Sequence, residues 1–101
     1  MQQIFVNKAG VRIRLTHERL QHILSNHSEM LSLIFEFKEV LINPDYIIAG
    51  KENEKIALRF YGNYYIVVIY KEEKNDGFII TAFKTTQVGY YLRKKILWKK
   101  M

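Results

Sequence analysis

The sequence predicts a single α+β domain in which two N-terminal helices pack on a four-stranded antiparallel sheet. Apolar residues recur at helical spacing before Pro44, and after it they alternate or form the short unbroken runs typical of strands. The chain has 101 residues, 49% of them hydrophobic, which is enough to bury one core. We therefore expect one domain over residues 1–101, with a basic C-terminal segment at residues 84–101.

Two helices are expected before Pro44. The first spans residues 16–26, because Thr16 is a good N-cap, Glu18 lies in the first turn, and an apolar stripe follows at helical spacing. The second spans residues 28–42, where the helical pattern continues until Pro44 favours a turn. Both helices are expected to cover one face of the sheet.

Four strands are expected after Pro44, at residues 46–48, 56–61, 64–70 and 78–83. The third of these is an almost unbroken run of apolar, β-branched and aromatic residues, so we expect it to be a central strand covered on both faces. A small additional hairpin is expected from residues 4–6 and 11–13, across a turn at residues 7–10.

The excess positive charge of the chain lies in its C-terminal segment. The net charge is +6, yet residues 1–50 hold five basic and five acidic groups, and residues 51–83 again hold five of each. The excess consists of six cations without an acidic residue among them: Lys84, Arg93, Lys94, Lys95, Lys99 and Lys100. With Tyr91 and Trp98 between them, these cations suit phosphate contact and base stacking. A solvated basic end that serves solubility is the alternative.

Composition excludes several kinds of site. The chain has no cysteine, which excludes disulfides, thiolate zinc sites and thiol nucleophiles and fits a reducing compartment. The N-terminus lacks the apolar stretch of a signal peptide, and the longest apolar run, residues 64–70, is too short to span a bilayer. We therefore expect a cytoplasmic protein with no membrane partner and no cofactor.

Three histidines, His17, His22 and His27, are the natural acid or base candidates because they titrate near neutral pH. On one helix, His17 and His27 would project near the apolar stripe and His22 on the polar side. Such histidines do not converge, and no carboxylate or cysteine cluster completes a ligand set, so no metal site is predicted. Taken singly, each histidine is better explained by a structural role at a helix junction or in the core.

Arg59 and Thr81 are the polar side chains within two of the predicted strands. An arginine in an otherwise apolar strand either pairs with a carboxylate or faces a cleft that binds an anion, and the sequence leaves both open. Thr81 is a common strand residue, yet its hydroxyl is also a possible hydrogen-bond donor to a phosphate.

Taken together, these residues form a pattern that resembles a known superfamily. The chain resembles small prokaryotic and phage-associated nuclease domains of the barnase, EndoU, colicin and RelE superfamily, called BECR-fold nucleases. The similarity extends from about Leu15 to Trp98. It rests on six segments, at residues 15–24, 27–30, 58–61, 65–68, 77–83 and 95–98.

The resemblance implies a metal-independent ribonuclease, since many such domains are toxins that act on tRNA or mRNA. Its pattern falls on His22, His27, Arg59 and Thr81. Ser28 stands where relatives often have proline, and no second histidine or acid follows directly after Thr81, so the general base is not identified.

The predicted function is therefore a toxin-type endoribonuclease that cleaves RNA by general acid–base attack of the 2′-hydroxyl. His22 or His27 would be the acid or base, Arg59 and Lys84 would hold the phosphate, and Thr81 would orient it. Two alternatives remain: a non-catalytic nucleic-acid-binding module, and a toxin–antitoxin interaction domain that docks an acidic antitoxin protein. The expected partner is RNA, and the expected state is a monomer or small homo-oligomer.

Overall fold

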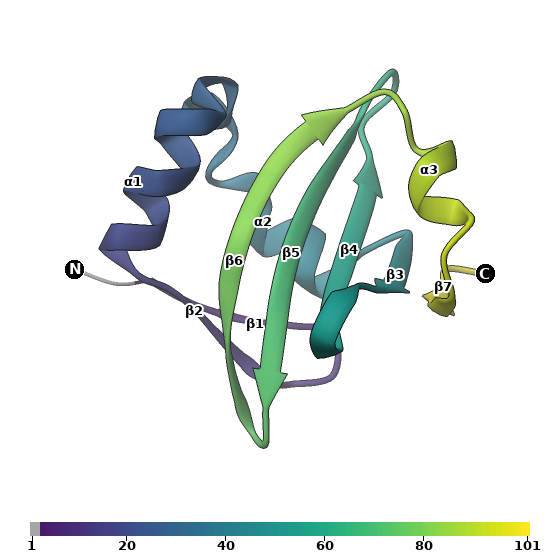
Figure 1. Cartoon of the computed structure of the whole chain (residues 1–101), viewed down its shortest axis with the longest axis horizontal. Coiled ribbons are helices and arrows are strands. Elements are labelled where there is room, and N and C mark those ends of the chain that lie inside the picture. The colour runs from purple at the N-terminus through teal and green to yellow at the C-terminus, as the bar shows by residue number, and fades with distance from the viewer. Residues whose placement is uncertain (1–2) are drawn as a thin grey trace.

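The computed structural model describes residues 3–101, and its strands form one mixed sheet (Figure 1). The strands are β1 (Gln3–Val6), β2 (Arg12–Leu15), β3 (Tyr46–Ala49), β4 (Glu54–Phe60), β5 (Tyr65–Glu73), β6 (Asp76–Thr85) and β7 (Ile96–Lys99). The helices are α1 (His17–Asn26), η1 (Ser28–Leu33), α2 (Glu36–Ile42), η2 (Lys51–Asn53) and α3 (Gly89–Leu92). The strand order within these residues is β1-β2-β6-β5-β4-β3-β7.

The predicted α+β class is correct, but the prediction of two helices on a four-stranded antiparallel sheet is wrong. The four expected strands are present as β3 to β6 and form an antiparallel meander. The N-terminal hairpin joins the same sheet because β2 pairs in parallel with β6, from Arg12 opposite Asp76 to Arg14 opposite Phe78. At the other edge β7 pairs antiparallel with β3, which gives a seven-stranded mixed sheet.

The prediction of one continuous second helix is also wrong. Residues 28–42 form the 3₁₀ segment η1 and then the separate helix α2, which begins at Glu36. A 3₁₀ segment has three residues per turn, so Met30 and Leu33 lie above each other and both reach the core. Phe35, between the two segments, is 90% exposed, because the break turns it away from the sheet.

The sheet is covered on both faces. We call its two sides the α2 face and the α3 face, after the helices that pack on them. On the α2 face, buried residues of β5 such as Ile66 and Val68 pack with helical residues such as Ile23 and Phe37. On the α3 face, Val67 belongs to a second cluster that includes residues of α3. The expectation that β5 is central and covered on both sides is therefore confirmed.

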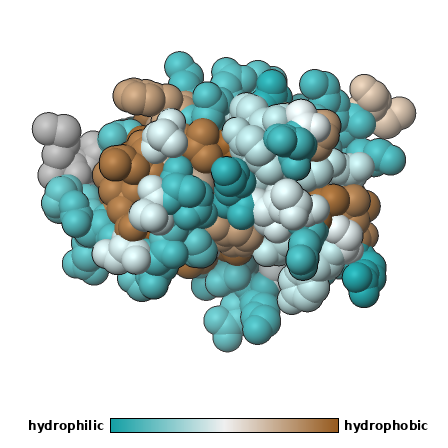
Figure 2. Space-filling view, turned by 90° about the horizontal axis from the view of Figure 1, so that it is seen from above, coloured by the Kyte–Doolittle hydropathy of each residue, from teal (hydrophilic) through white to brown (hydrophobic). Residues whose placement is uncertain are grey.

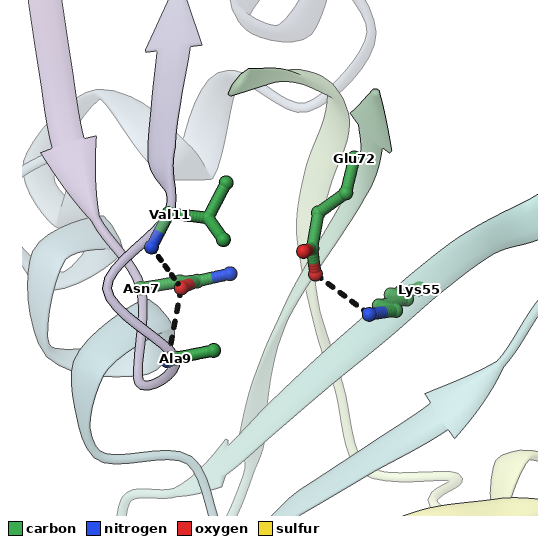
Figure 3. A network of polar contacts seen from close by, with 5 residues as sticks. All are labelled: Asn7, Ala9, Val11, Lys55 and Glu72. Atoms are coloured by element: carbon green, nitrogen blue, oxygen red, sulfur yellow. Dashed lines mark hydrogen bonds and ion pairs between the residues drawn. The ribbon is translucent and has the colours of Figure 1, made fainter. Parts of the chain in front are cut away.

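The turn between β1 and β2 is held by a buried asparagine. Asn7 is 4% exposed, and its Oδ1 accepts hydrogen bonds from the backbone N–H groups of Ala9, at 3.0 Å, and Val11, at 2.9 Å (Figure 3). Close by, Lys55 on β4 donates to Glu72 on β5 at 2.7 Å. The Asn7 contacts hold the turn that leads into β2, and the Lys55–Glu72 pair links β4 to β5.

Within residues 3–101, no helix combines the length and the apolar character that crossing a bilayer requires.

The end of the sheet where β4 and β6 finish has a divided surface. Seen from above in Figure 2, hydrophobic colour gathers on the side of α1 and in a smaller patch at the edge on the side of α3, and the surface between them is mostly hydrophilic or near neutral. Exposed Leu31 and Phe35 belong to the η1–α2 region. The predicted site residues Arg59, His27 and Lys84 lie at or near this end, because each is close to the end of its element.

Candidate functional site

The structure separates the three histidines. His17 and His22 are exposed on α1, whereas His27 caps the end of that helix and is half-buried. The His27 ring lies 5.5 Å from the Phe83 ring on β6, and its Nδ1 atom is 3.8 Å from Glu29 Oε2. His27 therefore contacts the sheet. Among the residues that the structure describes, no three His, Asp or Glu side chains are grouped so as to hold a metal ion.

Arg59 and Lys84 lie in one row across the sheet. Arg59 on β4 is opposite Ile66 on β5, and Ile66 is in turn opposite Lys84 on β6. Opposed residues share a face, and Ile66 belongs to the α2-face core, so both cations lie on the α2 face. Two strand spacings separate their backbones, which is roughly 10 Å.

A stacked pair of tyrosines lies beside these two cations, on either side of the β4–β5 turn. The rings of Tyr61 and Tyr64 are 6.0 Å apart with 17° between their planes. Arg59 Cζ lies 5.6 Å from the centre of the Tyr61 ring, and Lys84 Nζ lies 4.8 Å from that of Tyr64. We call these four residues the cation–tyrosine row.

The Arg59 end of this row is held by hydrogen bonds. The Tyr61 hydroxyl donates to Glu36 Oε2 at 2.9 Å, and Arg59 Nη1 donates to the Asn43 carbonyl at 2.6 Å. Burial raises the pKa of Tyr61, Glu36 raises it further, and Arg59 opposes them. Tyr61 therefore stays a hydrogen-bond donor. Arg59 Nε is buried, with no hydrogen-bond partner among the described residues.

Thr81 lies on the opposite face from Arg59. It is paired with Ile69, which packs with the α3-face cluster, and Phe83 lies two residues further along on that same face. The predicted residues thus form two groups: Arg59 with Lys84 on the α2 face, and His27 beside Phe83, on the face that carries Thr81. His22 is exposed on α1 and makes no side-chain hydrogen bond to either group within residues 3–101.

The basic C-terminal segment folds onto the sheet. Lys94 Nζ lies 5.0 Å above the Tyr90 ring, and Tyr91 packs 6.1 Å from Phe83. Trp98 on β7 meets Lys8 at 4.3 Å. The remaining predicted nucleic-acid-binding residues of this segment, Arg93, Lys95 and Lys99, are exposed. Arg93 and Lys95 follow α3, and Lys99 is the last residue of β7. Of the predicted nucleic-acid-binding residues, Lys84 is the one that belongs to the cation–tyrosine row.

A cavity of about 480 Å³ opens beside Arg59, and the sequence did not predict it. Its lining includes aromatic rings, two cations and one carboxylate: Tyr46, Phe60, Tyr65, Arg59, Lys100 and Asp45. These residues come from β3 and the residue before it, from β4 and β5, and from the chain after β7, so only the folded sheet brings them together. The one feature of the sequence that could have indicated this cavity is the cluster of aromatic residues around Gly62. The alternation expected of two strands explains that cluster equally well.

Comparison with models of protein families matches residues 1–99 to the family described as phage-Barnase-EndoU-ColicinE5/D-RelE like nuclease 2. No curated protein and no solved structure matches the chain. The family match covers nearly the whole sequence and agrees with the resemblance found in its motifs. The chain therefore belongs to the phage-Barnase-EndoU-ColicinE5/D-RelE like nuclease 2 family.

Proposed function

We propose that this protein is a toxin-type endoribonuclease that cleaves tRNA or mRNA without a metal ion, with the cation–tyrosine row as its RNA-binding surface. The observation that carries this proposal is the placement of Arg59 and Lys84 in one row, on either side of stacked Tyr61 and Tyr64. Cations bind the phosphates of a single strand, and aromatic rings stack on its bases.

The proposed reaction is attack of an RNA 2′-oxygen on the adjacent phosphorus. A general base takes the 2′-hydroxyl proton, the new P–O2′ bond forms, and the P–O5′ bond breaks as a general acid protonates the leaving oxygen. Arg59 and Lys84 stabilise the charge that develops on the phosphate. Either His22 or His27 serves as acid or base, and the contact of His27 with β6 favours His27. Thr81 lies on the other face of the sheet from these two cations, so it is left out of the proposed phosphate site.

The test is cleavage of total tRNA and of a structured mRNA in EDTA. Wild-type protein is compared with His22→Ala, His27→Ala, Arg59→Ala and Lys84→Ala. His17→Ala is the matched histidine control, because His17 is also exposed on α1. Lys51→Ala, on η2 at the other end of β4, is the lysine control. Cleavage lost with His27→Ala and Arg59→Ala, but kept in both controls, supports the proposal, and intact RNA with wild-type protein contradicts it.

A non-catalytic nucleic-acid-binding module is the second candidate. The cation–aromatic contacts of Lys84 with Tyr64 and of Lys94 with Tyr90 would serve binding without any acid or base. Salt-sensitive RNA binding without cleavage would select this function. An acidic antitoxin is the proposed protein partner, because it would complement the exposed cations Arg93, Lys95 and Lys99. Co-purification of a small acidic protein tests that partner.

A further inference from the structure

A second cavity, of about 390 Å³, lies on the α2 face of the sheet, at the end away from the cation–tyrosine row. Lys55 lines it and is opposite Tyr70, which belongs to the α2-face core. Lys55 precedes Arg59 by four residues on β4, which is roughly 13 Å along the strand. We propose that this cavity binds a small aromatic carboxylate, at a site separate from the one proposed for RNA.

The walls of the cavity are mainly aromatic and aliphatic. Trp98 on β7 is opposite Ile47 on β3, and both line the cavity together with Tyr70 and Leu97. Tyr70 is 2% exposed, so its ring is held rigidly in the core. A pocket of this volume with mostly apolar walls is a common setting for a small organic ligand. The two aromatic side chains favour a ligand with a ring of its own, because aromatic rings pack well against one another.

Asn7 supplies a fixed hydrogen-bond donor. It is 4% exposed, and its Oδ1 atom already accepts two N–H groups of the β1–β2 turn, so the amide cannot rotate without losing them. Its Nδ2 atom makes no hydrogen bond within residues 3–101. Figure 3 shows this nitrogen pointing away from the turn, toward the side of Lys55 and Glu72, which also line the cavity. A buried donor without an acceptor is costly, and a ligand oxygen would satisfy it.

The charges around the cavity favour an anion. Lys55 and Glu72 neutralise each other, with 2.7 Å between Nζ and Oε1. Lys8 also lines the cavity, and its Nζ atom lies 4.3 Å from the centre of the Trp98 ring. The ion pairs found within residues 3–101 do not include Lys8, so its charge is not neutralised by a carboxylate there.

These groups define the ligand by its chemistry. A ring packs against Trp98 and Tyr70, and a carboxylate attached to it accepts from Asn7 Nδ2 and lies near the Lys8 ammonium group. A ring with an ammonium group instead would be repelled by Lys8 and would leave the Asn7 N–H groups facing another donor. A flexible aliphatic carboxylate would keep the charge contact and lose the ring contacts.

Binding of three probes tests the site without relying on catalysis. Indole-3-acetate carries a ring and a carboxylate, tryptamine carries the same ring and an ammonium group, and hexanoate carries a carboxylate without a ring. Trp98 is the one tryptophan of the chain, so its indole N–H signal in a proton–nitrogen NMR spectrum reports on this cavity. We expect indole-3-acetate to shift that signal and to bind about tenfold or more tightly than either of the other probes.

Calorimetry of variants tests the residues that form the site. Asn7→Asp keeps an oxygen for the turn but replaces the donor by a like charge, so it should weaken indole-3-acetate by about tenfold or more. Trp98→Leu should weaken it by about tenfold. Lys8→Gln should weaken it by about threefold, because Lys8 is exposed and its charge is partly screened. Lys38→Gln is the matched control, since Lys38 is exposed on α2 and does not line the cavity.

Thermal melting of each variant identifies any that fails to fold, and Lys8→Gln keeps the test valid if Asn7→Asp is unstable. Equal affinities of indole-3-acetate and tryptamine, or of indole-3-acetate and hexanoate, would overturn the inference. So would an affinity for indole-3-acetate that Lys8→Gln and Trp98→Leu leave unchanged.

A competition arm separates this site from the proposed function. A 2′-O-methyl oligonucleotide at saturation should change the Kd of indole-3-acetate by less than about twofold at physiological salt, because charges this far from the cation–tyrosine row are largely screened. Displacement of the probe by the oligonucleotide would place the cavity within the RNA-binding surface and overturn the inference. Binding of indole-3-acetate by a protein that leaves RNA intact would overturn the ribonuclease function alone.

Discussion

Arg59 is the residue on which the candidate site depends most. It was predictable from sequence as an unusual cation in an apolar strand, but its partner was not. The sequence left a carboxylate partner or an anion-binding cleft open. The structure gives the Asn43 carbonyl and the Tyr61 ring as neighbours, and the ion pairs found within residues 3–101 do not include Arg59. Strand alternation predicts on which face of the sheet a side chain lies. Only the tertiary structure shows which residues that side chain contacts.

Replacing Arg59 by lysine keeps the charge and removes the planar guanidinium. An ammonium group cannot bind the Asn43 carbonyl and a phosphate with the same fork of donors, so we expect kcat/KM for RNA cleavage to fall about 100-fold. A fluorescent oligoribonucleotide measures the rate. Arg93→Lys is the control, because Arg93 is exposed and bonds only to the Gly89 carbonyl within the described chain. Full activity in Arg59→Lys would show that charge alone is sufficient there.

Tyr70 gives a prediction about stability at alkaline pH. It is buried on β5, and burial raises its pKa to about 12, with Glu72 adding to the rise and Asn7 opposing it. A pKa raised on folding means that the native state holds its proton more tightly than the unfolded state, whose tyrosine titrates near 10. The resulting stabilisation is complete below pH 10 and is lost as the pH rises toward about 12, by roughly 2–3 kcal/mol.

The measurement is thermal melting of wild-type protein and Tyr70→Phe between pH 9 and about 12. We expect the wild-type melting temperature to fall more steeply across this range than that of Tyr70→Phe, which has no hydroxyl to ionise. Tyr90→Phe, which changes a ring that is 58% exposed, should follow the wild-type curve. Parallel curves for wild-type protein and Tyr70→Phe would contradict the assignment.

At the scale of elements, local signals in the sequence predicted local structure. The Thr16 cap predicted the start of α1, and the Thr16 side chain does accept a hydrogen bond from the Arg19 N–H at 3.1 Å. Alternation after Pro44 predicted β3 to β6. Residues 28–42 are apolar at too many positions to define one helical face, so the break between η1 and α2 was not visible. The pairing of β2 with β6 joins residues more than sixty positions apart, and no local pattern encodes it.

Gly77 is the position where the β2–β6 pairing depends on one residue type. A Cβ atom there would collide with the Lys71 carbonyl oxygen and lie 2.9 Å from Ile13 Cδ1 on β2. We expect Gly77→Ala to lower the free energy of unfolding by about 1–3 kcal/mol, because backbone or core atoms must shift. Urea unfolding measures the loss. Gly89→Ala, at the start of α3, is the matched control, since a Cβ there meets nothing within 4 Å. Equal free energies of unfolding of the two variants would show that β2 shifts to accommodate the added methyl group without loss of stability.

At the scale of the whole molecule, the sequence predicted where the excess charge lies but not how it is arranged. Residues 84–101 carry six cations, and the fold divides them between the row at the end of β6 and the surface of α3 and β7. The candidate site also draws residues from before that segment, such as Arg59, Tyr61 and Asp45. Counting charge along the chain could not find them, because residues 51–83 are balanced overall and Arg59 is one of five cations among five acids.

The salt dependence of RNA binding tests whether the row carries the phosphate contacts. A single-stranded 2′-O-methyl oligonucleotide lacks the attacking hydroxyl, so its binding can be measured without cleavage. Each phosphate contact to a single strand contributes about 0.7 to the slope of log affinity against log salt.

We expect Lys84→Gln to reduce the slope by about that amount, because Lys84 lies in the row beside Tyr64. Lys51→Gln makes the same charge change on η2, at the other end of β4, and should leave the slope unchanged. Equal changes of the slope in both variants would mean that RNA affinity depends on the net charge of the protein and not on where the cations lie at this end of the sheet.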